Sequence, residues 1–223
     1  MAIRRSVLPA LAFALALTLT LILPAAAQTV EPPFRVYLPL ALRMKPAKYT
    51  LTPTGDAFVF EAGPNTNTGS EPALYIGNDQ DPETRLGILR SFVHFQLPDI
   101  TSYEVGKATL RLYYAGYADF PDTNRPLLIQ IAAGPWQENT VTWVNQPPAG
   151  HIVTVAPINS NQPFGYVELD VTNKIRGWLD DTNPNYGFML VGLEKADDDW
   201  SYRVFASRES AYPPQLVIES YQP

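Results

Sequence analysis

Charged, amide and aromatic side chains alternate with apolar ones along three stretches of this chain. They are Arg90, Phe92, His94 and Gln96, then Thr109, Arg111 and Tyr113, and finally Gln130. Guanidinium groups bind carboxylates through two parallel hydrogen bonds, and aromatic rings offer flat apolar platforms. These residue types would suit a shallow polysaccharide groove, provided that the three stretches are neighbouring strands with this face exposed. The alternative, that another part of the chain covers the face, stays open.

Catalytic chemistry is harder to build from this composition. The chain has no cysteine and two histidines, His94 and His151, which leaves few groups for a nucleophilic triad or a zinc site. A pair of carboxylates can cleave a glycosidic bond, so the acidic residues need inspection. By their positions in the chain, the candidates for such a catalytic pair are Glu138, Glu168, Asp170 and Glu209. We expect structural roles instead: a bond from Glu138 to loop backbone, a place for Asp170 beside a helix start, and a solvated strand position for Glu168.

Oxygen ligands for calcium gather on one predicted strand and the loop after it. The set is Asp56, Glu61, Asn65 and Asn67, and residues 197–199 form a second group of three aspartates. Calcium prefers such carboxylate and amide oxygens. Neither group has the spacing of a recognised calcium loop, so ordinary polar loops are the alternative to a structural calcium ion.

Period-two alternation and turn residues predict the elements that would position these groups. Twenty-two prolines and 13 glycines separate short apolar runs, which is typical of an all-β domain with rigid loops. The predicted fold is an antiparallel β-sandwich or jelly roll with one short helix at 172–179, with Thr172 as its N-cap. The predicted strands are 57–60, 74–77, 90–97, 107–115, 127–132, 152–155, 166–171, 187–193, 201–207 and 215–221.

Residues 136–148 contain two tryptophans seven positions apart, followed by two prolines. The prolines end any strand ladder because proline has no N–H to donate. We interpret the segment as an irregular crossover that Trp136 and Trp143 pin to the core. A sugar-stacking role for the two indoles is the alternative.

The first 27 residues have the pattern of a secretory signal peptide. Arg4 and Arg5 precede an apolar run, and an A-x-A site precedes Gln28. The paired arginines also suit a twin-arginine signal, and an uncleaved membrane anchor is a further alternative. We expect secretion, an N-terminal arm or linker at 28–48, and one folded domain at 49–223.

Charge excludes some classes of partner. The predicted signal holds two of the 16 basic residues and none of the 22 acidic ones, so the remainder has a net charge of −8. Nucleic acid and anionic membranes are therefore poor partners after signal cleavage. Without cysteine, the hydrophobic core has to hold the fold, and 46% hydrophobic residues suffice for that.

Several segments in order resemble one family of secreted proteins. They are GPNTNTG at 63–69, RSFVHF at 90–95, ATLRLY at 108–113, WQENTVTWVNQP at 136–147, DVT at 170–172, YGF at 186–188, SRES at 207–210 and PPQL at 213–216. In this order and spacing they are similar to the DNRLRE-domain family, over most of the chain from about residue 55 to 221. The resemblance implies a carbohydrate-binding module of the alginate-binding type.

We therefore expect a secreted, non-catalytic domain that binds a polysaccharide, possibly an acidic one such as alginate. An extracellular surface or matrix protein that self-associates without binding glycan is the alternative. A glycosidase or polysaccharide lyase is the third reading.

Overall fold

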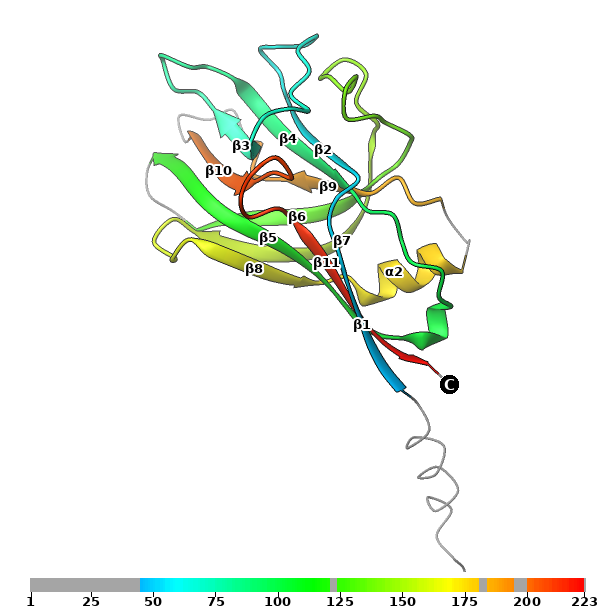
Figure 1. Cartoon of the computed structure of the whole chain (residues 1–223). Coiled ribbons are helices and arrows are strands. Elements are labelled where there is room, and N and C mark those ends of the chain that lie inside the picture. Colours follow the sequence, from blue (N-terminus) through cyan, green and yellow to red (C-terminus); the bar gives the residue numbers. More distant parts are fainter. Residues whose placement is uncertain (1–44, 121–123, 181–183, 195–199, 223) are drawn as a thin grey trace, which may run out of the picture. The chain divides into compact units, whose positions relative to one another are not determined.

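The computed structural model describes residues 45–120, 124–180, 184–194 and 200–222. Within them the chain forms a curled antiparallel sheet with one short α-helix, which confirms the predicted all-β sandwich (Figure 1). The predicted signal, most of the predicted arm and residues 197–199 lie outside this part. The strands are β1 Lys45–Leu51, β2 Gly55–Phe60, β3 Ala73–Asp79, β4 Gly87–His94, β5 Val105–Phe120, β6 Asn124–Ala132, β7 Ala149–Asn159, β8 Gly165–Asp170, β9 Phe188–Val191, β10 Trp200–Ala206 and β11 Gln215–Gln222.

The strand order is β1-β11-β5-β10-β3-β4-β9-β6-β7, with β2 also on β4 and β8 also on β5. The first strand begins four residues before the predicted domain start, and in Figure 1 it lies, in blue, beside the red β11. The 16-residue β5 makes the sheet continuous. Its first half pairs with β11, its second half with β10, and β8 pairs along its other edge.

No helix in the described part of the chain is both long and apolar enough to span a membrane.

The main core lies between the inner faces of the curled sheet, and β5 shows why. Its even-numbered residues Ala108, Leu110, Leu112 and Tyr114 are all fully buried. Alternation sends successive side chains to opposite faces of a strand, so these four point inward as predicted. Burying one such leucine contributes about 1.5–3 kcal/mol, and the core contains one from each of several strands.

A short helix closes one end of the sandwich and begins where the sequence predicted. Helix α2 spans Thr172–Leu179 and buries Ile175 and Trp178 against the core. The prediction of Thr172 as N-cap is wrong, since Val171 holds that position. The Thr172 hydroxyl instead accepts a hydrogen bond from the backbone N–H of Ala108, at 2.9 Å. Asp170 lies beside the helix start, as expected, and accepts the Thr172 N–H at 2.8 Å.

A second apolar cluster lies on the opposite face of β4 and β9. Phe92 and Met189 are fully buried there, and Val141 covers them from the loop between β6 and β7. This loop, residues 133–148, connects two strands that pair with each other, so it is a long hairpin loop and not a crossover between distant strands as predicted; we keep the name crossover for it. It contains turns and no strand, which confirms the prediction of an irregular segment. The Trp136 and Phe92 rings pack with their centroids 5.4 Å apart.

Removal of the Phe92 ring should therefore destabilise the fold. Phe92→Ala opens a cavity under the crossover, and we expect a loss of about 3–5 kcal/mol in the free energy of unfolding. Val144 lies on the same crossover but is 69% exposed. Val144→Ala should change stability by less than about 0.5 kcal/mol. Urea unfolding of both variants measures the difference, and equal effects would contradict the packing described.

Candidate functional site

The residues predicted to line one groove fall into two separate groups. Phe92 on β4 and Gln130 on β6 lie in one row, because each is paired with Met189 of the intervening β9. Arg111 and Tyr113 lie on β5, which β10 and β3 separate from β4. The expectation that these strands neighbour one another is therefore wrong. The reason is that β5 uses its two edges for β8 on one side and for β10 and β11 on the other.

The crossover covers Phe92 and Arg90 of the group on β4. Phe92 is buried, and Arg90 forms two hydrogen bonds with Glu194, at 2.6 and 2.9 Å. The Arg90 guanidinium also lies 4.8 Å from the centre of the Trp143 ring and donates to Gln146 at 3.3 Å. The bond to Glu194 raises the pKa of Arg90. These contacts fix the crossover on the sheet, so both tryptophans have the pinning role that we predicted.

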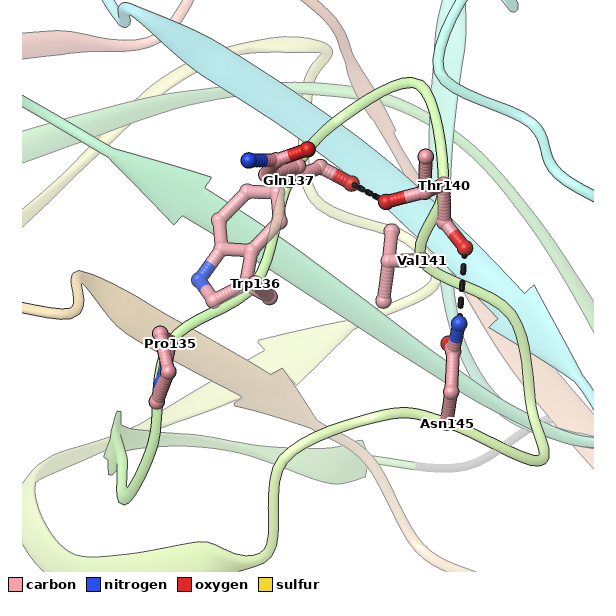
Figure 2. A pocket seen from close by; sticks show the side chains of 6 residues that line it. All are labelled: Pro135, Trp136, Gln137, Thr140, Val141 and Asn145. Atoms are coloured by element: carbon pink, nitrogen blue, oxygen red, sulfur yellow. Dashed lines mark hydrogen bonds between the residues drawn. The ribbon is translucent and has the colours of Figure 1, made fainter.

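Two surface hollows remain on either side of Trp136, each of about 320 Å³. Figure 2 shows the first, with the indole on one side and Asn145 on the other. His94 lines the second, with Thr54 and Glu138. The Trp136 ring is partly exposed, and its N–H donates to the Tyr186 carbonyl at 2.7 Å.

Burial lowers the pKa of His94, whose Nδ1 lies 2.6 Å from the Thr54 hydroxyl. Gln96 is exposed just beyond β4 and lines a neighbouring depression together with His94.

The β5 group lies in an aromatic cluster. Tyr113 stacks on Tyr212, with centroids 4.3 Å apart and an interplanar angle of 11°, and meets Tyr166 edge-on at 5.3 Å. The Arg111 guanidinium lies 4.3 Å from the centre of the Tyr166 ring and donates to Glu168 at 3.0 Å. Tyr212 is 51% exposed, so the stack reaches solvent. Sequence reasoning missed Tyr166 and Tyr212; the alternation of β8 placed Tyr166 outward, but no local pattern marks Tyr212.

A hollow of about 270 Å³ lies on the outer face of β1, β11, β5 and β8, and we call it the cationic groove. Three of its seven lining side chains are cationic and two are anionic, on a chain whose net charge is −6. Lys48 and Lys107 are exposed, whereas Arg111 is held by Glu168 and by the Gln215 side chain. The lining residues are Lys48, Lys107, Thr109, Arg111, Glu168, Val217 and Glu219.

The predicted calcium set does not gather. Asp56 is the second residue of β2 and Glu61 follows its last residue, so five residues of extended chain, about 16 Å, separate the two. The Asn67 side chain is used by backbone, because its amide donates to Glu138 O and Val141 O, at 2.6 and 2.9 Å. Asn65 is exposed in the same loop.

Asp56 instead meets two carboxylates that the sequence placed among candidate acids. One oxygen each of Asp56, Glu138 and Glu209 lies within 4.8 Å of the others, and we call these three residues the acidic cluster. Glu138 accepts the Asp56 N–H at 2.9 Å, so it bonds backbone of strand β2 and not the loop backbone that we predicted. The Arg208 guanidinium forms ion pairs with both glutamates, with Nη1 3.2 Å from Glu138 Oε1 and Nε 3.3 Å from Glu209 Oε1. Gly69 packs against this loop so closely that a Cβ there would collide with the Glu138 carbonyl.

Asp56 is 1% exposed, and burial raises its pKa to about 8. The negative charges of Glu209 and Glu138 act in the same direction, while the hydrogen bond from the Arg208 N–H lowers the pKa. Each of the other candidate acids has a structural partner. Glu168 pairs with Arg111 and is exposed, and the Thr172 hydrogen bonds lower the pKa of Asp170.

The raised pKa predicts a pH-dependent stability in buffer that contains a chelator. An unfolded Asp56 ionises near pH 3.8, but the folded one only near pH 8. The stability from protonated Asp56 is complete below pH 3.8 and is lost as the pH rises toward 8. Asp56→Asn should remove this contribution, so the difference in unfolding free energy between wild type and variant should change by up to about 1.4 kcal/mol per pH unit. Urea unfolding from pH 4 to 9 tests this, and a constant difference would contradict it.

Of the comparisons with known proteins, the search of curated proteins found no match. The family model of carbohydrate-binding module family 96 matches residues 47–220, which run from β1 to β11 and include the crossover, the acidic cluster and the cationic groove. The chain therefore belongs to carbohydrate-binding module family 96.

Proposed function

We propose that this protein is a secreted, non-catalytic domain that binds an acidic polysaccharide, such as alginate, along the cationic groove. The family establishes a carbohydrate-binding domain. Support for secretion is the signal-like pattern of residues 1–27.

The observation that carries the proposal is the juxtaposition of Lys48, Lys107 and Arg111 beside the tyrosine cluster. An acidic polysaccharide repeats a carboxylate on successive sugars, so a row of cations can pair with several of them at once. The exposed Tyr212 ring, stacked on Tyr113, offers an apolar face to a sugar ring. The Arg111 side chain is already held by Glu168 and Gln215, so little conformational entropy is lost when it binds.

The net negative charge of the chain opposes an acidic polymer at long range. Salt screens charges beyond about 8–10 Å at physiological ionic strength, so contacts inside the groove decide the affinity there. Glu168 and Glu219 also lie in the groove and would repel a carboxylate placed beside them. The groove therefore favours a polymer whose carboxylates fall next to the two lysines and whose hydroxyls face the glutamates.

Affinity electrophoresis of the purified protein in gels with alginate, pectin or neutral glucans tests the substrate class, with and without calcium. We expect retention by an acidic polysaccharide that weakens as salt rises. Lys107→Gln should weaken binding roughly threefold to tenfold, since it removes one charge-assisted contact at an exposed position. Arg85→Gln is the matched control, because it removes one exposed positive charge from the β3–β4 loop, outside the groove.

The other outcomes are informative. Retention by neutral glucans alone would contradict the acidic specificity. Binding that survives Lys107→Gln together with Tyr212→Ala would move the site to the hollows beside Trp136. A folded protein that no glycan retains, and that self-associates as its concentration rises, would favour the surface or matrix role.

A further inference from the structure

The acidic cluster joins three parts of the chain that are distant in sequence. Asp56 is the second residue of β2, Glu138 belongs to the crossover, and Glu209 lies in the loop between β10 and β11. Oxygen atoms of the three carboxylates lie within 4.8 Å of one another. Like charges at this separation repel, most strongly at the buried Asp56, so the cluster with all three groups ionised needs a compensating positive charge.

Arg208 compensates only part of this charge. Its Nη1 lies 3.2 Å from Glu138 Oε1, and its Nε lies 3.3 Å from Glu209 Oε1. When all three carboxylates are ionised, as an ion bound between them requires, one guanidinium leaves an excess of two negative charges. A divalent cation would neutralise that excess.

Asp56 also has an oxygen atom with unused bonding capacity. Its Oδ2 accepts the Arg208 N–H at 2.8 Å, whereas its buried Oδ1 has no hydrogen-bond partner among the described residues. The residue is only 1% exposed. A buried carboxylate oxygen without a partner is costly, and in folded proteins such atoms are usually satisfied by a hydrogen bond, an ordered water molecule or an ion.

The chemistry of the donors selects the kind of ion. All three side chains offer carboxylate oxygens, which are hard ligands, and none offers nitrogen or sulfur. Calcium accepts six to eight oxygens in flexible geometry, while magnesium demands a near-ideal octahedron. Glu138 also lines the hollow that it shares with Thr54 and His94, through which water molecules can reach the cluster and complete the coordination.

We propose that Asp56, Glu138 and Glu209 bind a calcium ion. The ion ties β2, the crossover and the β10–β11 loop together in a domain without cysteine. Its role is thus to hold the crossover on the sheet, independently of any glycan bound at the cationic groove.

Isothermal titration and thermal unfolding of the chelator-treated, purified protein test the site, with calcium chloride as the probe and magnesium chloride as the comparison. We expect one saturable calcium site and a rise in Tm of about 5–10 °C at a calcium concentration 100-fold above Kd. Magnesium at the same concentration should give less than half of that shift. Terbium can replace calcium, and its luminescence under tryptophan excitation should report on binding near Trp136.

Two variants locate the ion. Asp56→Asn and Glu209→Gln should each weaken calcium binding at least tenfold, while each keeps a side-chain oxygen that can accept the present hydrogen bonds. Glu83→Gln, which removes an exposed carboxylate from the β3–β4 loop, should bind calcium as wild type does. Circular dichroism in chelator confirms that each variant is folded.

Absence of saturable calcium binding to the folded wild type would overturn the proposal and leave Arg208 as the cation of the cluster. Calcium binding that both variants retain would overturn it as well, since the ion would then lie elsewhere. No glycan enters these measurements, so their outcome is independent of the test of the cationic groove.

Discussion

Trp136 rests on Phe92 with its indole N–H bonded to the Tyr186 carbonyl, and this contact holds the crossover against the outer face of β4 and β9. The indole buries a large apolar area against the Phe92 ring of β4. Buried side chains of β2, β6 and β9 belong to the same cluster. Arg90 adds a second fixed point, because Glu194 orients its guanidinium over Trp143. This docking decides which polar face of the sheet is exposed. It removes the outer face of β4 and β9 from solvent and leaves the outer face of β5 and β8 open.

The two faces consequently have different chemistry. On the covered face, charged residues such as Arg90 are bonded to partners within the chain and stabilise the crossover. On the open face, Lys48 on β1 and Lys107 on β5 are exposed and line a hollow that faces solvent. The length of β5 makes this division possible. One continuous strand pairs with β11 at the groove and with β10 farther along, so the groove is built on a rigid ladder and not on a loop.

Positive and negative side chains also gather at different places on the domain. The chain is acidic overall, yet the groove carries more cations than anions, while three carboxylates converge at the start of β2 with a single arginine. Asn67 and Gly69 help to position that convergence, the first through hydrogen bonds to Glu138 O and Val141 O and the second through close backbone contact. The loop that contains Asn67 and Gly69 thus acts as a spacer under the crossover.

The sequence by itself determined most of the strands, the short helix and the inward side of β5, because period-two alternation and turn residues are local properties of the chain. It did not predict β1, and β2 and β9 are buried on both faces. The even-numbered residues of β5 and the crossover with its two pinning tryptophans could be read in that way. Motif order was also enough to indicate a carbohydrate-binding family. Tertiary structure alone decided which strands are neighbours and which of two polar faces is covered. Phe92 and Arg111 both occupy predicted outward positions in alternating segments. The strand order places them on strands that are not neighbours, and the docked crossover buries only Phe92. Asp56 and Glu138 are 82 positions apart, and their meeting depends on long-range packing, which no local pattern encodes.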